Sequence, residues 1–191
     1  MKTKLYVSLS ACLLIFLGSF LLGYNYIETN KKEEYTYVDD LIFENIEDEI
    51  EKIVYDGFTR EELINKINKS LNSTISNKGD LIVDYSLEFD VDPYLATAII
   101  LHETGCKWEC SNLVKNCNNV GGQKGSPSCN GGAYRSYETL EEGVKGCIRN
   151  LSNNYIKKGL VTPEQIGPKY AASKTWASKI NYYIEEIKNK D

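Results

Sequence analysis

Several features that would indicate a particular chemistry are scarce in this chain of 191 residues. It has one histidine, His102, so a cysteine or serine protease built on a histidine base is not expected. Lys and Arg (22) are outnumbered by Asp and Glu (27), lysines occur in short pairs, and the net charge of −5 argues against a nucleic-acid partner. No internal repeat and no strand–helix–strand alternation is visible. These absences leave one mainly helical core as the expectation.

The first 24 residues predict a membrane anchor. Residues 1–4 are cationic, and residues 5–24 carry no charge over roughly the twenty positions that a helix needs to cross a bilayer. The two lysines should stay in the cytoplasm, which predicts a single-pass protein of the cell membrane with its remainder outside the cell. A cleaved signal peptide is the main alternative, although no Ala-x-Ala site precedes Tyr24. A lipoprotein box at residues 9–12 is disfavoured because the apolar run continues past Cys12.

Residues 25–78 predict a charged, amphipathic helical stalk. Apolar residues recur at helical spacing from Leu41 to Val54, and Gly57 ends the run. Residues 59–62 have the form of a capping box and start a second helix, whereas residues 71–79 are typical of a loop. The two helices could pack on the following domain, pair with a partner protein or act as a spacer. The sequence does not decide among these three placements.

The compact domain is expected over residues 79–191. A short helix comes first, and a second begins with Asp92 as N-cap and Pro93 in the first helical position. Capping boxes at residues 139–142 and 162–165 predict two later helices, the first of which Gly159 stops. A last helix is predicted from about Thr175.

Glu103 is the most informative residue of this domain. Ala96, Ile99, Ile100 and Glu103 fall at three- and four-residue spacings, so the carboxylate continues the stripe that must face the core. Contact with apolar surface removes water from a carboxylate and raises its pKa toward the range of a general acid. The pattern therefore predicts a proton donor. The alternative is a helix-end carboxylate that reaches solvent past Gly105.

Five cysteines lie in this domain, four of them in a segment rich in Asn and Gly that suits turns and a small hairpin rather than helix. Outside the cell thiols tend to oxidise, so two disulfides and one free thiol are expected, although spacing does not decide which cysteines pair. Zinc binding by four cysteines is the alternative, but the short Cys-x-x-Cys pairs of structural zinc sites are missing. The four are Cys106, Cys110, Cys117 and Cys129.

Short segments of this domain follow one another in a fixed order, namely Phe89-Asp90-Val91-Asp92-Pro93, Glu103-Thr104-Gly105, Asn118-Asn119-Val120-Gly121-Gly122, Tyr134-Arg135-Ser136-Tyr137-Glu138-Thr139, Tyr170-Ala171 and Trp176-Ala177-Ser178-Lys179-Ile180. With these segments in this order, the chain resembles the bacterial peptidoglycan N-acetylglucosaminidases of lysozyme-like fold. The resemblance implies a mainly α, lysozyme-like domain with a small β-hairpin and Glu103 as the general acid. It also implies a sugar groove lined by Asn118, Asn119, Tyr134, Tyr137 and Tyr170. The chain departs from the family at Gly121, where an aromatic residue is frequent.

These residue types suit the cleavage of a glycosidic bond. The departing oxygen needs a proton, which Glu103 supplies, and N-acetyl sugars need hydrogen-bond partners such as asparagine amides. Tyrosine offers an apolar face with a polar tip, although with 14 tyrosines in the chain any single one is more simply explained by packing. Residues 123–135, where some family members carry a second carboxylate, contain none, and Glu109 and Glu138 are the nearest acids. A single carboxylate assisted by the N-acetyl group of the substrate, or a transglycosylase-like route, is therefore expected.

The sequence as a whole predicts a peptidoglycan hydrolase that cuts the β-1,4 glycan strand at N-acetylglucosamine without a cofactor or metal ion. A muramidase or lytic transglycosylase on the same fold is the nearest alternative. An alternative of another class is a non-catalytic wall-binding module that works with protein partners in an envelope or conjugation apparatus. The missing second acid and the departure at Gly121 leave this last alternative open.

Overall fold

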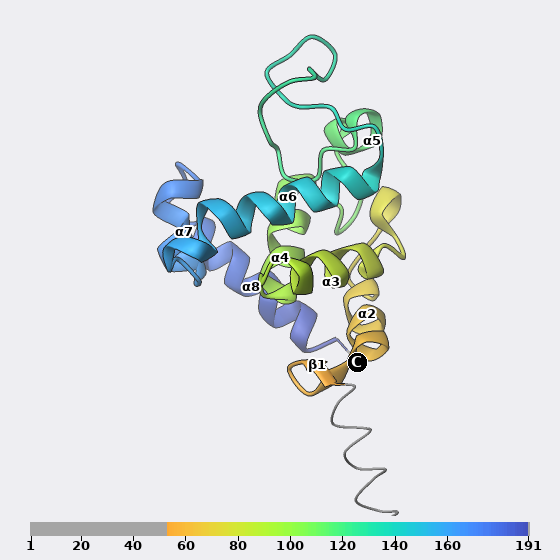
Figure 1. Ribbon diagram of the computed structural model, residues 1–191, viewed down its shortest axis with the longest axis vertical. Coiled ribbons are helices and arrows are strands. Elements are labelled where there is room, and N and C mark those ends of the chain that lie inside the picture. The colour runs from red at the N-terminus through yellow and green to blue at the C-terminus, as the bar shows by residue number, and fades with distance from the viewer. Residues whose placement is uncertain (1–52, 191) are drawn as a thin grey trace, which may run out of the picture. The chain divides into compact units, whose positions relative to one another are not determined.

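Helix α4 (Pro93–Thr104) lies at the centre of the fold, and other helices pack around it (Figure 1). The computed structural model describes residues 53–190, which from Val54 onward form one compact unit. In chain order the described elements are β1 (Ile53–Tyr55), β2 (Phe58–Thr59), α2 (Arg60–Asn68), a 3₁₀ turn (Ser73–Ile75), α3 (Gly79–Glu88), α4, α5 (Asn112–Cys117), α6 (Leu140–Asn154), a second 3₁₀ turn (Ile156–Lys158), α7 (Pro163–Tyr170) and α8 (Trp176–Lys188). The predicted mainly helical class is confirmed.

Local signals at both ends set the length of α4. The Asp92 carboxylate accepts hydrogen bonds from the backbone N–H groups of Tyr94 (2.7 Å) and Leu95 (3.2 Å), and Pro93 occupies the first helical position. Gly105 ends the helix with a left-handed φ of 66°. The predicted start and end of this helix are confirmed.

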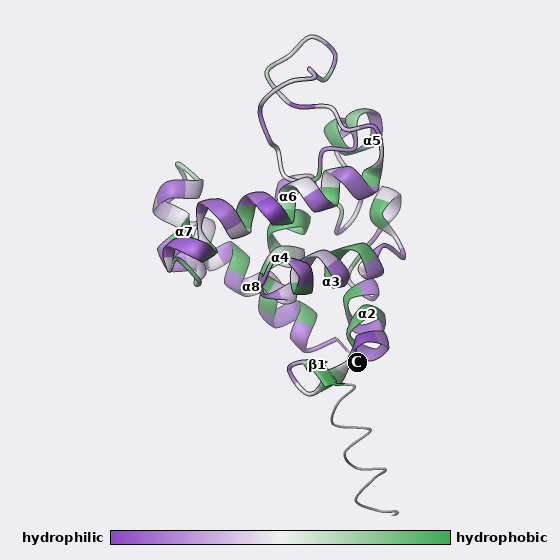
Figure 2. Cartoon of the chain, in the orientation of Figure 1, coloured by the Kyte–Doolittle hydropathy of each residue, from purple (hydrophilic) through white to green (hydrophobic). Residues whose placement is uncertain are grey.

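Apolar side chains on all faces of α4 form the middle of the core. Residues 93–101 are all buried, and Figure 2 shows hydrophobic residues along this helix. Helices α3 and α8 pack directly on α4, α6 packs on α3, and α7 packs on α8. A helix that is apolar all round belongs in the interior of a domain, so the far end of α4 is the part that can present a functional group to solvent.

Helix α2, which was expected within the stalk, packs on this same core. Its predicted capping box is present, because the Thr59 hydroxyl accepts from the backbone N–H of Glu62 and the Glu62 carboxylate accepts from that of Thr59. The inner face of α2 and the loop after it bury four aliphatic side chains, Leu63, Ile67, Leu71 and Ile75. Of the three placements left open, packing on the domain is the one found for this part of residues 25–78.

Residues 53–59 form a β-hairpin, so the prediction that a helix runs through Val54 to Gly57 is wrong here. The two residues between the strands, Asp56 and Gly57, have left-handed φ angles of 50° and 78°. A two-residue type I′ turn requires positive φ at both positions, and Asp-Gly is among its preferred sequences. The turn therefore overrides the helical spacing of the apolar residues. Residues 41–52 of the predicted helix lie outside the described residues.

The segment between α4 and α6 contains a short helix, α5, that the sequence did not predict. Its Asn-rich composition indicates turns, yet six residues form a helix that ends at Cys117. Asn118 caps it with a φ of 53°, which asparagine tolerates. Residues 123–135 then form the predicted hairpin through isolated antiparallel bridges, Lys124 with Tyr134 and Ser128 with Arg135. This loop projects beyond α5 and α6 at the top of Figure 1.

Two disulfides stabilise this segment, and both are formed by the four cysteines considered as zinc ligands. Cys106–Cys110 closes the turn after α4, and Cys117–Cys129 joins the end of α5 to the hairpin. Cys147 is free and buried. The expected two bridges and one free thiol are confirmed, and the zinc alternative loses its ligands because bridged sulfurs are not thiolates.

Helices α6, α7 and α8 begin where the sequence predicts. The Thr139 hydroxyl accepts from the backbone N–H of Glu142 (3.1 Å), and Thr162 forms a full capping box with Gln165. Helix α6 ends at Asn154, before the predicted stop, and Gly159 caps the 3₁₀ turn that follows it.

No helix within residues 53–190 is both long and apolar enough to cross a membrane. The predicted anchor at residues 1–24 and the first part of the predicted stalk lie outside the described residues.

Candidate active site

Glu103 lies in the last turn of α4, and its side chain is exposed. The other residues of its stripe, Ala96, Ile99 and Ile100, are each 0 % exposed. This face of α4 therefore passes from the core to solvent within the last turn of the helix. The expectation that apolar surface covers this carboxylate is therefore wrong for the free protein, and the helix-end alternative holds. The carboxylate faces Gly122, since a Cβ atom added to that glycine would lie 3.5 Å from Glu103 Oε2.

The turn that follows Glu103 is held by hydrogen bonds and a covalent bridge. The Thr104 hydroxyl accepts from the backbone N–H of Cys106 (3.1 Å), and the Cys106 carbonyl accepts from the backbone N–H of Asn72 (3.1 Å). The disulfide to Cys110 closes the same turn. These contacts fix the end of α4 and therefore the backbone from which the carboxylate projects.

Two side chains that are distant in sequence share the surroundings of Glu103, namely Cys147 of α6 and Tyr170 of α7. Burial raises the pKa of the Cys147 thiol to about 12, and the nearby charge of Glu103 is the second cause. Burial also raises the pKa of Tyr170, with further contributions from Cys147 and Glu103. At neutral pH the thiol and the phenol are therefore uncharged.

Tyr170 is the sequence-predicted site residue that the structure brings toward Glu103. Its ring stacks on Trp176, with 4.8 Å between ring centroids, and lies 5.6 Å from Tyr155. These rings hold the half-buried tyrosine at the end of α7. Beside it, a cavity of about 540 Å³ opens between α7 and α8. Glu103 does not line this cavity. Its walls are Glu164, Gly167, Pro168, Ala171, Ala172, Ser173, Lys174 and Ala177.

Asn118 and Asn119, predicted to bind sugar, are used by the protein to hold its own loop. Asn119 is 0 % exposed; its amide donates to the carbonyls of Gln123 (2.8 Å) and Arg135 (2.7 Å), and its Oδ1 accepts from the Gln123 N–H (3.0 Å). Asn118 donates to the Tyr137 carbonyl (3.1 Å). In contrast to the prediction, the Asn119 side chain is closed to a sugar because all its polar groups are bonded inside the protein. Contact between Asn118 and a sugar stays a prediction.

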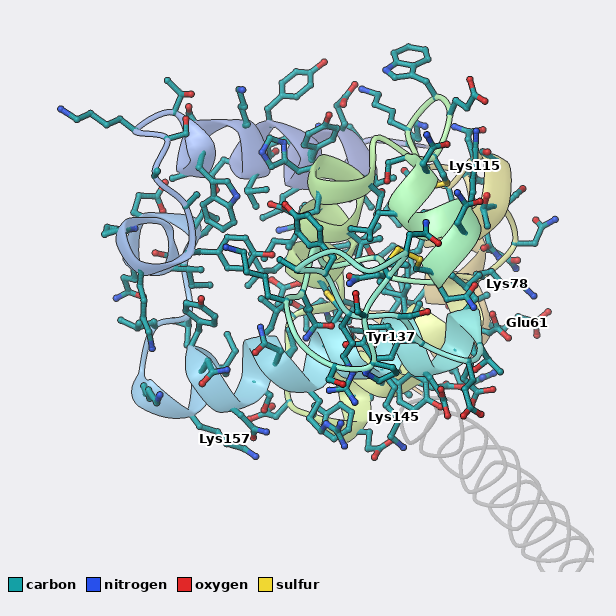
Figure 3. The ribbon with its side chains drawn as sticks, turned by 90° about the horizontal axis from the view of Figure 1, so that it is seen from above. Glu61, Lys78, Lys115, Tyr137, Lys145 and Lys157 are labelled. Carbon is teal, nitrogen blue, oxygen red and sulfur yellow. A yellow bond between two sulfur atoms is a disulfide. The ribbon has the colours of Figure 1, made fainter. Side chains whose placement is uncertain are left out.

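Tyr137 lies over α6 (Figure 3) and joins the hairpin to that helix. Its hydroxyl donates to the side-chain carbonyl of Gln123, whose amide donates to the Gly146 carbonyl (3.1 Å). The Arg135 guanidinium lies 5.2 Å from the Tyr137 ring, and burial raises the pKa of this tyrosine. Tyr134, in contrast, is 45 % exposed on the hairpin. Sugar contact stays a prediction for both tyrosines, with a positioning role also visible for Tyr137.

Gly121 lies against the Cys147 thiol, in the place where the resemblance leads one to expect an aromatic residue. A Cβ atom added to Gly121 would lie 2.7 Å from Cys147 Sγ and 3.2 Å from its Cβ. Cys147 therefore fills the volume that a larger residue at position 121 would need. Sequence reasoning did not assign Cys147 to the site. Two signals were available: Cys147 lies outside the segment that holds the other four cysteines of the domain, and position 121 carries an unusual glycine.

The other two acids considered for a catalytic role lie in local arrangements of their own. Glu109 accepts from Lys115 Nζ (2.6 Å), and this ion pair holds the pKa of Glu109 below its ordinary value. The backbone N–H of Glu138 donates to the Glu142 carboxylate (3.1 Å) at the start of α6. This agrees with the helix-start explanation of Glu138. Glu103 is thus the acid that the fold presents beside Gly122.

Metal ligands do not converge in the part of the chain that the structure describes, since no group of three His, Cys, Asp or Glu side chains there could hold an ion. His102 follows a different face of α4 from Glu103, and its ring lies 6.1 Å from that of Tyr183 in α8. The expectation that no cofactor is needed stays a prediction.

A family model described as mannosyl-glycoprotein endo-β-N-acetylglucosaminidase matches residues 79–189, which is more than half of the chain. The chain belongs to the glucosaminidase family. The match runs from the first residue of α3 to just past the end of α8, so it includes Glu103, Cys147 and Tyr170. The resemblance drawn from the short motifs is confirmed, and it places the chain in a family of glycoside hydrolases.

Solved structures of S. aureus autolysin E share the fold of this chain. The autolysin E complex with the muropeptide NAM-L-Ala-D-iGlu has 18% sequence identity and a TM-score of 0.55, and the match covers 68% of this chain and 66% of that chain. A catalytic mutant of autolysin E in complex with the disaccharide NAG-NAM has 17% identity and a TM-score of 0.56, with the same coverage. This chain thus spans just under two thirds of the autolysin E chains that it matches. No curated protein matches the chain.

Proposed function

We propose that this glucosaminidase hydrolyses peptidoglycan and cleaves its β-1,4 glycan strand at N-acetylglucosamine. Membership of the family supports the reaction class, and the neighbouring fold of autolysin E, which binds a muropeptide and the disaccharide NAG-NAM, supports peptidoglycan as the substrate. The observation that carries the proposal is the position of Glu103. A buried helix ends there, and an exposed carboxylate faces Gly122 and lies near enough to Cys147 and Tyr170 for its charge to raise their pKa values.

Glu103 acts in this proposal as the general acid that protonates the departing glycosidic oxygen. A glycan seated over the exposed carboxylate would exclude water from it and bring the oxygen within hydrogen-bonding reach. The neutral hydroxyl of Tyr170 is available to donate a hydrogen bond on the α7 side. With Glu109 paired to Lys115, the N-acetyl group of the substrate takes the place of a second carboxylate.

The test is the substitution Glu103→Gln in the full-length chain, assayed on purified cell walls by release of soluble sugars. Loss of a general acid lowers the rate by about 10²- to 10⁴-fold. Because the side chain is exposed, the melting temperature should not change. Glu61→Gln, an exposed acid in the first turn of α2, is the matched control and should keep full activity. A Glu103→Gln protein that clears walls as fast as the control would refute the assignment.

The linkage that is cut separates this proposal from its nearest rivals on the same fold. Mass spectrometry of the released fragments identifies their reducing ends. N-acetylglucosamine ends support a glucosaminidase, muramic acid ends indicate a muramidase, and anhydro-muramic acid ends indicate a lytic transglycosylase.

A non-catalytic wall-binding module is the second candidate, and one observation favours it: residues 123–135 carry no acid to pair with Glu103. Such a module would sediment with insoluble wall and release no sugars. Partners in an envelope apparatus would then supply the chemistry.

We further propose that residues 5–24 anchor the protein in the cell membrane with the glucosaminidase domain outside the cell. The length of the uncharged segment and the lysines before it support this topology. Protease added to intact cells should then digest the domain, whereas a cytoplasmic marker stays intact. Recovery of the chain in the soluble fraction would contradict the proposal.

A further inference from the structure

Four aromatic side chains form a continuous strip on the turn after α4, on α4 itself and on α8. The strip consists of Trp108, Tyr182, Tyr183 and His102. Between ring centroids, Tyr182 and Tyr183 are 6.0 Å apart and Tyr183 and His102 are 6.1 Å apart. Trp108 joins them through Lys107, whose Nζ lies 5.6 Å from the Trp108 ring and 5.4 Å from each of the two tyrosine rings.

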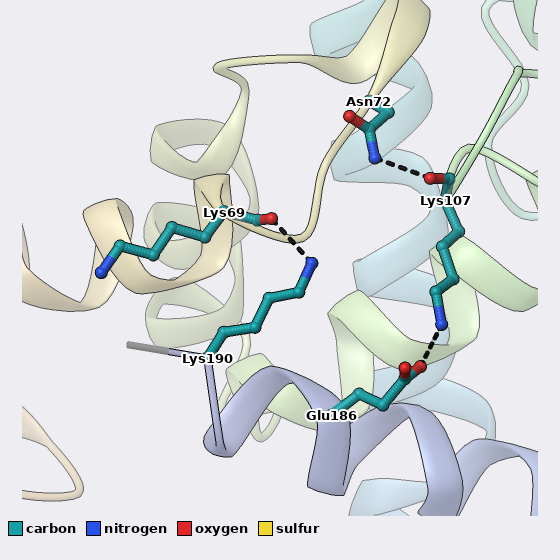
Figure 4. Close-up of polar contacts among 5 residues, drawn as sticks. All are labelled: Lys69, Asn72, Lys107, Glu186 and Lys190. Atoms are coloured by element: carbon teal, nitrogen blue, oxygen red, sulfur yellow. Dashed lines mark hydrogen bonds and ion pairs between the residues drawn. The ribbon is translucent and has the colours of Figure 1, made fainter.

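Lys107 holds this aromatic strip in one arrangement. Its ammonium forms an ion pair with Glu186 of α8, and its backbone carbonyl accepts from the Asn72 side chain (2.6 Å) (Figure 4). The ion pair keeps the pKa of Glu186 below its ordinary value. Because Lys107 is paired with Glu186 and lies close to three of the rings, these rings are pre-organised before anything binds.

Two of the four rings in the strip are too exposed to be explained as core. Trp108 is 80 % exposed and Tyr182 is 59 % exposed. Beside them lies a hollow of about 410 Å³, lined by His102, Ser178, Lys179, Tyr182 and Tyr183. This volume falls in the range of small-ligand sites, and exposed aromatic surface with a polar rim is typical of a binding surface.

The strip ends next to the candidate active site. His102, which lines the hollow, directly precedes Glu103 in the last turn of α4, so the hollow begins one residue away from the carboxylate, on a neighbouring face of the helix. A linear polymer cut at Glu103 extends on both sides of the cleavage site, so it can reach a surface at the same end of α4. Continuity with the site thus indicates the same polymer as its occupant.

We infer that the aromatic strip is a second saccharide-binding subsite, which holds the glycan strand beyond the bond that faces Glu103. The inference rests on the proposed function. The C–H faces of a pyranose ring are apolar and pack on aromatic rings, whereas its hydroxyl and N-acetyl groups point to the rim. Ser178, Lys179 and His102 supply hydrogen-bond donors at that rim.

The test measures binding by the full-length chain with Glu103→Gln in the background, so that strands stay uncut. The probes are glycan strands freed of stem peptides, the disaccharide NAG-NAM and a free stem peptide. Trp108→Ala and Tyr182→Ala should each weaken binding of the strands by roughly three- to tenfold and leave the disaccharide unaffected. Ring-retaining Trp108→Phe and Tyr182→Phe should bind nearly as well as the background. Val161→Ala, which removes an exposed apolar side chain elsewhere (53 % exposed), is the matched control.

The outcomes distinguish this inference from the proposed function. If Trp108→Ala and Tyr182→Ala bind strands as tightly as Val161→Ala does, or if they weaken only the stem peptide, the subsite is refuted whether or not the wild type cleaves walls. An equal loss for strands and disaccharide also refutes it, because the rings would then belong to the cleavage site. If the wild type releases no sugar but strand binding still depends on the rings, the subsite stands and hydrolysis fails.

Discussion

The contact between Gly121 and Cys147 determines how closely the glycine-rich turn approaches Glu103. The φ of Gly121 is not in the left-handed region, so alanine is sterically allowed by the backbone itself, and the cost of Gly121→Ala comes from its collision with Cys147 Sγ. Overpacking of this kind costs about 1–3 kcal/mol. We expect Gly121→Ala to lower the free energy of unfolding by this amount in urea denaturation, and to slow wall hydrolysis because Gly122 faces the carboxylate.

Removing the sulfur should cancel most of that cost. Cys147→Ala leaves space where Sγ was, so the double variant should be more stable than the sum of the two single changes predicts, by about 1 kcal/mol or more. Strict additivity of the two changes would mean that the thiol and position 121 do not compete for the same volume.

The buried Cys147 thiol also predicts how stability changes with pH. The pKa of the thiol is about 12 in the folded protein against an ordinary value of 9.0, so above pH 9 the unfolded chain loses a proton that the folded chain keeps. The free energy of unfolding should then fall by up to about 1.4 kcal/mol per pH unit. Cys147→Ala should remove this fall between pH 9 and 10. Above pH 10, tyrosines with raised pKa such as Tyr85 and Tyr94 add a fall of the same sign in both proteins.

At the level of single residues, sequence reasoning located the carboxylate but not its surroundings. Glu103 was found because a charge at the end of an apolar stripe is visible in one short segment. Its exposure depends on where α4 leaves the core, and the roles of Asn119 and Cys147 depend on Arg135 and Gly121, which reach them only in the folded chain. Such long-range partners have no local signal.

Among the elements, those with local end signals were predicted and those without them were not. Helices α4, α6 and α7 start at side-chain caps that a few consecutive residues specify. The hairpin at residues 53–59 was missed although Asp56-Gly57 is a strong turn signal, because the apolar spacing before it also fits a helix. Helix α5 was missed because asparagine-rich composition favours turns, whereas the disulfide from Cys117 to Cys129 constrains its end.

The two disulfides should contribute unequally to stability because they close loops of different length. Cys117–Cys129 spans 12 residues and Cys106–Cys110 spans 4. On loop-closure entropy, the first stabilises the fold by about 3 kcal/mol and the second by about 2 kcal/mol. We expect Cys117→Ser with Cys129→Ser to lower the free energy of unfolding more than Cys106→Ser with Cys110→Ser does, as measured by urea denaturation. The opposite order would show that the turn after Glu103 is the more important constraint.

For the whole molecule, the core extends beyond the region that defines the family. The family model begins at residue 79, whereas α2 and the loop after it bury Leu63, Ile67, Leu71 and Ile75 in the same core as α4. Helix α2 packs on α3, and Asn72 binds the turn that follows Glu103. The part of the predicted stalk from residue 54 onward therefore belongs structurally to the catalytic unit.

This arrangement predicts where the chain can be shortened. Each fully buried aliphatic side chain contributes about 1.5–3 kcal/mol, so losing four of them would remove an amount comparable to the whole stability of a typical domain. A protein of residues 79–191 should therefore be unfolded or aggregated, whereas residues 54–191 should fold, unfold cooperatively on heating and clear cell walls. Circular dichroism during thermal unfolding checks both. A cooperative transition for residues 79–191 at the temperature found for residues 54–191 would show that α2 only covers the core and does not help to hold it together.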